Sequence, residues 1–174
     1  MVQDSLPAII DVEASGFGRG SYPIEIGVAM SNGDLHCFLI RPPADWQHWD
    51  RNAEQVHGIS RAILEQHGRP VDDVAVALNA LLWGQTVYSD AWGHDSSWIG
   101  KLFDAASSHP RFRILTLREL LSDAQVRCWQ QARQQLTAIE AQRHRASNDA
   151  RLIQQTYALS AALADSFFEP PTPA

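Results

Sequence analysis

Residues 8–13 read Ala8-Ile9-Ile10-Asp11-Val12-Glu13, a short apolar stretch that contains two acidic residues. Such a run is typical of a buried β-strand. Side chains alternate between the two faces of a strand, so Asp11 and Glu13 project from the same face. Burying two carboxylates without compensation is unfavourable, because an isolated buried charge loses its hydration. A bound cation would remove the conflict, and the alternative is a strand end exposed to solvent.

The segments after this strand predict an α/β fold. Two apolar runs at 24–30 and 35–40 flank an Asn-Gly turn at 31–34, which indicates an antiparallel hairpin. The remaining pattern predicts helices at 60–66, 72–82, 95–103, 116–121, 124–143 and from Ser147 onward, with strands at 86–89 and 112–115. We expect a mixed five-stranded sheet, with an antiparallel meander as its first three strands and helices on both faces. This order fits a ribonuclease-H-like layout.

Length and composition indicate one globular domain. The chain has 174 residues, of which 45% are hydrophobic and 20% charged, and these values are ordinary for such a domain. We expect a single domain over 1–168 and a flexible tail over 169–174, which is rich in proline. The sequence has neither a long apolar run nor a signal-peptide pattern, so we expect a cytoplasmic protein without a membrane contact. Cys37 and Cys128 lack metal-ligand spacing and are expected to be buried thiols.

The net charge of −6 disfavours a purely electrostatic grip on long nucleic acid, because such binding depends on Lys and Arg near phosphates. Divalent cations held by clustered carboxylates can supply positive charge locally. Total charge therefore does not exclude a polyanionic substrate.

Asp149 is a candidate partner for the two acids of the first strand. It shares the apolar stripe of the last helix with Ile153 and Tyr157, which predicts an inward side chain. The alternative role is a cap at the start of that helix, a position for which Ser147 is also a candidate.

Asp95 and His144 are, like Asp149, ambiguous candidates when each is taken alone. Asp95 stands where an apolar helix face begins, and an acid there also favours the helix dipole. His144 precedes Asp149 by five residues, and an imidazole can take up a proton near neutral pH. The same spacing joins His67 to Asp72 between two helices, and we interpret that copy as solvated surface.

Four segments together resemble a known family, the DEDD superfamily of exonucleases in its histidine-bearing branch. That branch includes ribonuclease T, oligoribonuclease and the proofreading subunit of the bacterial replicative polymerase. The segments are Ile9-Ile10-Asp11-Val12-Glu13-Ala14-Ser15-Gly16-Phe17, Pro23-Ile24-Glu25-Ile26-Gly27, Val56-His57-Gly58-Ile59-Ser60 and His144-Arg145-Ala146-Ser147-Asn148-Asp149-Ala150-Arg151. The resemblance covers residues 8 to 158, and the match is loosest at 89–95. There the family often has His-Asn before its aspartate, so Asp90 is the alternative to Asp95.

The resemblance implies a metal-dependent 3′→5′ exonuclease that acts on single-stranded DNA or RNA. Asp11, Glu13, Asp95 and Asp149 would hold two divalent ions, Mg²⁺ or Mn²⁺, which prefer such hard oxygen ligands. His144 would be the general base that takes a proton from the attacking water.

The resemblance also implies where the terminal nucleotide binds. Ala14, Ser15, Gly16 and Phe17 would lie beside it, and His57 would touch it near its 3′ end. Gly16 permits a close backbone approach. Phe17 would stack on a base, or alternatively pack in the core.

Other interpretations remain open at the level of sequence. Arg145 and Arg151 flank the last motif and are candidates for phosphate contacts. The polar helix at 124–143 would shape substrate preference or pair two subunits into a homodimer. Alternative functions are a metal phosphodiesterase for nucleotides or short oligonucleotides, and a non-catalytic nucleic-acid-binding version of the fold.

Overall fold

The computed structural model describes residues 6–137 and 144–166. At its centre lies a five-stranded sheet with the order β3-β2-β1-β4-β5. The strands are β1 (Ile9–Ala14), β2 (Pro23–Ala29), β3 (Leu35–Leu39), β4 (Thr86–Ser89) and β5 (Arg113–Thr116). The first three strands pair antiparallel, whereas β4 runs parallel to both β1 and β5. The predicted mixed α/β sheet and its opening meander are confirmed.

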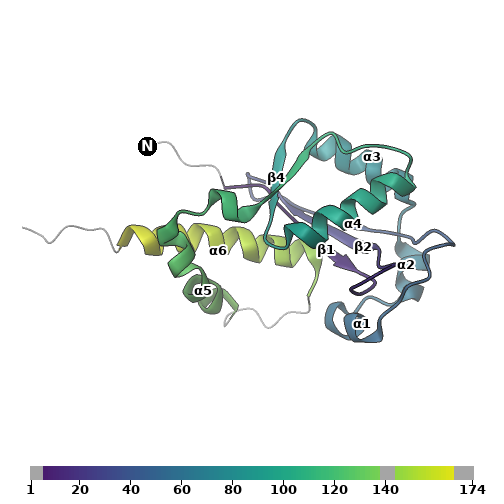
Figure 1. Ribbon diagram of the computed structural model, residues 1–174, viewed down its shortest axis with the longest axis horizontal. Coiled ribbons are helices and arrows are strands. Elements are labelled where there is room, and N and C mark those ends of the chain that lie inside the picture. Colours follow the sequence, from purple (N-terminus) through teal and green to yellow (C-terminus); the bar gives the residue numbers. More distant parts are fainter. Residues whose placement is uncertain (1–5, 138–143, 167–174) are drawn as a thin grey trace, which may run out of the picture.

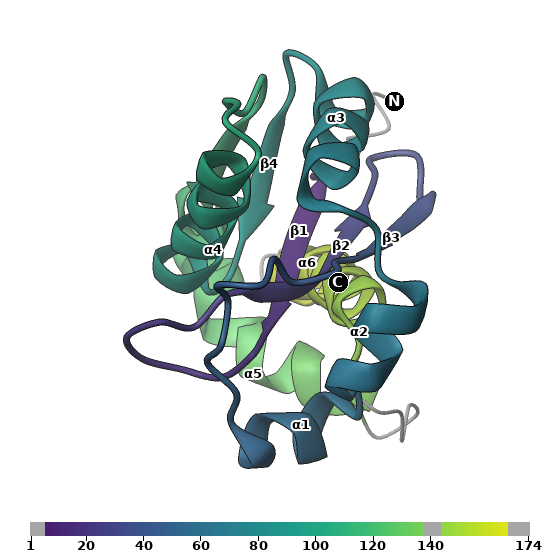
Figure 2. The same cartoon turned by 90° about the vertical axis from the view of Figure 1, so that its right-hand side faces the viewer.

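Helices cover both faces of this sheet. They are α1 (Arg51–His57), α2 (Arg61–His67), α3 (Val71–Leu82), α4 (Trp92–Ala105), a 3₁₀ turn (Leu117–Leu120), α5 (Asp123–Thr137) and α6 (Ala146–Ser166). Figure 2 shows α3 and α4 on one side of the sheet and α6 on the other. In Figure 1, α5 lies beside α6, and α1 and α2 gather at the opposite end of the molecule.

Alternate side chains along β1 pack into two separate hydrophobic cores, one on each face of the sheet. Ile10 and Val12 pack in the larger core with residues of α3 and α4, whereas Ile9 packs in a smaller core with residues of α6. Ile9 and Ile10 are fully buried, and each such side chain contributes about 1.5–3 kcal/mol to stability. Asp11 and Glu13 share the face of Ile9 by the two-residue period of the strand. Both acids therefore lie on the side of the sheet that α6 covers.

Helix α1 occupies a region that the sequence pattern predicts to be a loop. The side chain of Asp50 accepts a hydrogen bond from the backbone of Asn52 at 2.8 Å, and Gly58 ends the helix in the left-handed conformation at φ 70°. These are ordinary helix start and stop signals. The helix has seven residues and buries only His57. Its sequence therefore shows no apolar periodicity that would have revealed it.

The ends of two other helical segments also differ from expectation. α6 begins at Ala146, so Ser147 lies inside the helix and its predicted capping role is wrong. The carbonyl of Arg145 already accepts the Asp149 amide at 2.9 Å, so the residue in the cap position is Arg145, two residues before Ser147. Thr116 does cap the following turn, but that turn is a four-residue 3₁₀ helix.

The two cysteines are free thiols in different environments. Cys128 is buried on α5, whereas Cys37 is exposed. The prediction of a buried thiol is wrong for Cys37, because it lies on β3, an edge strand of the sheet.

Within the described ranges, no helix has the length and apolar character required to cross a bilayer. The predicted domain boundary at 168, the tail at 169–174 and the last part of the polar helix at 138–143 lie outside the described residues.

Candidate active site

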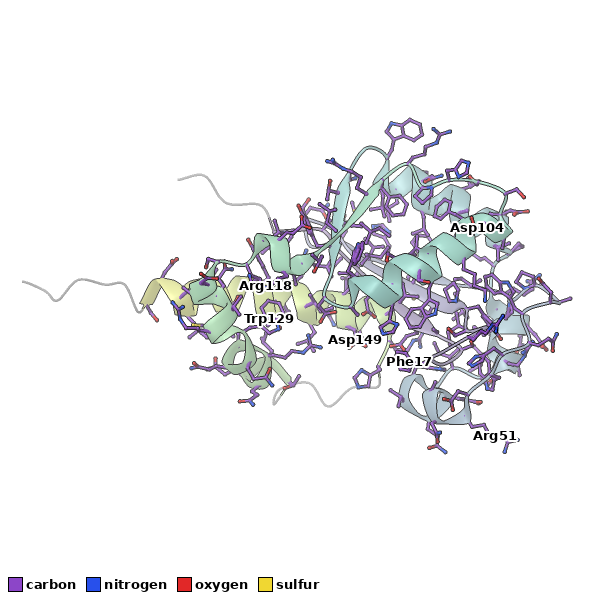
Figure 3. The ribbon with its side chains drawn as sticks, viewed as in Figure 1. Phe17, Arg51, Asp104, Arg118, Trp129 and Asp149 are labelled. Atoms are coloured by element: carbon purple, nitrogen blue, oxygen red, sulfur yellow. The ribbon has the colours of Figure 1, made fainter. Side chains whose placement is uncertain are left out.

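Three carboxylates predicted to meet do meet. Ligand oxygens of Asp11, Glu13 and Asp149 all lie within 4.8 Å of one another. Two of these acids come from β1, and the third comes from the first turn of α6, more than a hundred residues later. Figure 3 labels Asp149 at the end of α6 that lies nearest the sheet.

The register between β1 and β2 explains how α6 reaches the acids. Asp11 is paired with Gly27, and Glu13 with Glu25. A β-carbon at Gly27 would lie only 2.1 Å from the backbone of Ala146, so the start of α6 rests directly on β2. Asp149, one turn into the helix, is thereby brought beside the neighbouring strand.

The negatively charged carboxylates of the cluster repel one another. Burial raises the pKa of Asp11 well above its usual value, and the nearby charges of Asp95, Glu13 and Asp149 raise it further. Burial and the charge of Asp149 raise the pKa of Glu13 to about 7. A divalent cation would relieve this repulsion, and clustered carboxylate oxygens suit a hard ion such as Mg²⁺ or Mn²⁺. The donor set therefore fits the expected metal.

Asp95 comes from α4, which lies on the side of the sheet that faces away from α6. It lies in the first turn of α4, is 1% exposed, and accepts a hydrogen bond from the Ser89 hydroxyl at 2.5 Å. Burial raises its pKa to about 7 despite that hydrogen bond. It lines the same cavity as Asp11 and Glu13, although its oxygens are not part of the three-carboxylate group found among the described residues.

Asp90, the alternative to Asp95, has a different partner. Its carboxylate pairs with the guanidinium of Arg133 from α5 at 3.2 Å. Burial nevertheless raises the pKa of Asp90, and the charge of Asp149 adds to the effect. Helix α5 thus places the guanidinium of Arg133 next to Asp90, near the acid cluster. The sequence carried no signal for this contact.

His144 lies in direct contact with the cluster. Its Nδ1 is 3.3 Å from Oδ2 of Asp149, and its side chain is 61% exposed. An exposed imidazole next to the acids is accessible to water and to a substrate. His67 and Asp72, which share the same sequence spacing, are both exposed on the surface, as interpreted from sequence.

A cavity of about 370 Å³ adjoins the acids. Four of the five residues predicted to contact substrate line it, namely Ala14, Gly16, Phe17 and His57. Ser15 is not among the lining residues. Its hydroxyl lies 2.9 Å from His48 Nδ1 and accepts the amide of Tyr22 at 3.1 Å, so it fastens the loop that follows β1.

Aromatic rings form another part of the cavity lining, called here the aromatic wall. Phe17 is 69% exposed and meets His94 edge-on, with ring centroids 5.3 Å apart. His94 in turn stacks on Trp98 at 5.5 Å. The alternative that Phe17 packs in the core is wrong, because its ring is exposed and lines the cavity.

Two contributors to the cavity were missed from sequence. His94 lies next to Asp95 in α4, and its i,i+4 spacing to Trp98 was the available indication. Helix α1 supplies Ala53 and Val56 beside His57, and its end signals at Asp50 and Gly58 were the available indication.

Arg145 is not among the residues that line the cavity. Its guanidinium binds the buried carboxylate of Glu25, and a contact with phosphate stays a prediction.

No protein-family model and no curated protein matches this sequence. Solved structures of E. coli exonuclease I do resemble the fold. The zinc-bound complex with single-stranded DNA has a TM-score of 0.64 at 15% identity, and it covers 95% of this chain and 41% of that chain. The product-bound structure of exonuclease I gives 0.65 at 14% identity, with 95% and 46% covered.

The chain therefore spans less than half of the exonuclease I structures that it matches. At this level of identity the likeness concerns the fold. The ribonuclease-H-like arrangement of the sheet and helices, as found in an exonuclease, is thereby confirmed.

Proposed function

We propose that this chain is a divalent-metal-dependent 3′→5′ exonuclease of the histidine-bearing DEDD type, acting on single-stranded nucleic acid. One observation carries the proposal: Asp11, Glu13 and Asp149 converge to within 4.8 Å, with His144 in contact with Asp149. The likeness to exonuclease I, which has been solved with single-stranded DNA, supports the same class of substrate.

In this proposal each acid has a defined part. Asp11, Glu13 and Asp149 hold divalent cations, and Asp95 supports them directly or through water. Bound Mg²⁺ or Mn²⁺ would supply charge neutralisation at the phosphodiester and would activate water for attack. His144 accepts the proton that the attacking water loses, because it is exposed beside the cluster.

The cavity would hold the terminal nucleotide. Phe17 offers an exposed ring for stacking. His57 is buried, and its Nδ1 accepts the Ile59 amide at 3.0 Å, so Nε2 carries the proton. Burial lowers the pKa of His57 and keeps the ring neutral. Within the described part of the chain, His57 Nε2 has no hydrogen-bond partner, and we propose that it donates to the sugar end of the nucleotide.

The test is digestion of 5′-labelled DNA and RNA single strands with Mg²⁺ or Mn²⁺. We expect a ladder that shortens from the 3′ end with wild-type protein and none with Asp149→Ala. The matched control is Asp72→Ala, which removes an exposed acid from α3 and should leave the ladder unchanged. Cleavage that starts within the strands, or digestion by Asp149→Ala at the wild-type rate, would contradict the proposal.

A phosphodiesterase for short oligonucleotides is the second candidate. It is favoured by the net charge of −6 and by the cavity, whose described lining contains neither lysine nor arginine. Rates on mononucleotide esters, short oligomers and long strands separate the two. A rate that falls steeply with length favours this candidate.

A further inference from the structure

A fully buried carboxylate lies outside the proposed metal set. Glu25 on β2 is 0% exposed and accepts hydrogen bonds from two neighbouring residues of the last motif. Arg145 Nε donates to Oε1 at 2.9 Å and to Oε2 at 3.0 Å, with Nη2 also bonded to Oε1. The backbone amide of Ala146 donates to Oε2 at 2.9 Å. The thiol of Cys37 completes the shell at 3.2 Å.

These contacts keep Glu25 charged inside the protein. Burial alone would raise the pKa of Glu25, but the hydrogen bonds from Arg145, Cys37 and Ala146 lower it overall. A buried ion pair is weak evidence for stability, because desolvation opposes the attraction. A forked guanidinium on a carboxylate does fix geometry, since two donors must align at once.

The location of this ion pair gives it a specific consequence. Arg145 lies between His144 and Ala146, the first residue of α6. Glu25 is paired across the strands with Glu13. Among the described contacts, His144 is held by Asp149 alone, and its side chain is 61% exposed. The backbone position of His144 therefore depends on Arg145, which is anchored to Glu25.

We propose that Glu25 and Arg145 are positioning residues that fix His144 and the start of α6 against the acid strand. The inference rests on the proposed role of His144 as general base. Arg145 therefore affects turnover by its grip on Glu25 rather than by contact with a phosphate.

The test uses Arg145→Ala, since the Arg145 side chain is 45% exposed and its removal leaves a site that guanidinium ion from solvent can enter. Turnover on an oligonucleotide with Mn²⁺ should fall about 100-fold, as expected for a misplaced catalytic group, with KM changed less than about threefold. Millimolar guanidinium should raise the turnover of Arg145→Ala by at least about tenfold. The same ion should not rescue His144→Ala. Arg127→Ala, an exposed arginine on α5, is the matched control and should behave like wild type.

Hydrogen exchange of the metal-free protein gives a second readout that needs no activity. In Arg145→Ala, amides 146–149 should exchange faster than in wild type, while those of β4 and α3 stay unchanged. Turnover within about twofold of wild type, a loss confined to KM, a loss that guanidinium does not rescue, or unchanged exchange at 146–149 would each overturn the inference. If wild-type protein digests no oligonucleotide, the proposed function fails, and exchange alone decides whether Arg145 anchors the segment.

Discussion

The two walls of the cavity are built in different ways. The acid wall comes from regular elements: Asp11 and Glu13 from β1, and Asp95 from the first turn of α4. The aromatic wall depends on Phe17, which lies on a loop and is 69% exposed, and on His94, which lies beside Asp95 in α4. The acid wall places charge where a phosphodiester would react, whereas the aromatic wall offers surface for a base. Changes to the first should therefore alter turnover, and changes to the second should alter binding.

The largest effect is expected from Asp11→Asn. Loss of this charge should lower turnover with Mn²⁺ about a thousandfold, because metal-ion catalysis supplies several kcal/mol. The same change should raise the free energy of unfolding of the metal-free protein, since burial and four neighbouring acids oppose the charge of Asp11. Single-turnover kinetics and thermal unfolding without metal measure the two results. A variant that is both inactive and less stable would show that Asp11 serves the fold instead.

His144→Ala should lower turnover on the order of 10²-fold, because it removes a general base. Oligonucleotide binding in the presence of metal should stay near the wild-type affinity, since the side chain is 61% exposed and contacts only Asp149 among the described residues. Turnover and fluorescence-anisotropy titrations provide the comparison. Near wild-type rates would remove His144 from the mechanism.

Phe17→Ala should act on the other wall. Base stacking on an aromatic side chain contributes about 1–3 kcal/mol, so KM should rise about tenfold while turnover at saturation changes little. Thermal stability should hardly move, because the ring is 69% exposed. Val76→Ala is the matched control, since Val76 is an exposed apolar side chain on α3, away from the cavity. An equal KM for Phe17→Ala and the control would count against a stacking role.

The smallest effect is a dependence of stability on pH. The pKa values of Glu13 and Asp95 are each raised to about 7, so the folded protein binds more protons than the unfolded chain just below that pH. Stability of the metal-free protein should therefore increase as the pH falls from about 8 through 7. Saturating Mn²⁺ should weaken or reverse this trend, because the cation competes with protons for the carboxylates. Thermal melts across this range, with and without Mn²⁺, make the measurement, and a metal-free Tm that falls with decreasing pH would contradict it.

The acid wall could be predicted from sequence for a physical reason. Asp11 and Glu13 lie two residues apart in an apolar strand, and Asp149 lies on an apolar helix stripe, so local periodicity allowed inward side chains, and the resemblance of the combined motifs predicted that they meet. The aromatic wall could not be predicted in the same way. The contact of Phe17 with His94 spans 77 positions and depends on the path of a loop. Long-range partners such as Glu25 and Arg145 have no local signature at all.

The ends of the helices were also beyond what local sequence patterns could predict. The sequence favoured Ser147 as a helix cap because of its side chain, but a buried carboxylate on β2 binds the Ala146 amide and starts α6 earlier. Tertiary contact thus overrode the intrinsic capping preference. The predicted homodimer and the cytoplasmic location stay predictions.

The close packing of α6 on β2 has a steric consequence. At residue 27 the chain has a hydrogen atom where any other amino acid would put carbon, and that carbon would overlap the backbone of Ala146. The separation between sheet and helix is therefore set by the smallest side chain available. Through it, a position that carries no functional group determines how near Asp149 can come to Asp11.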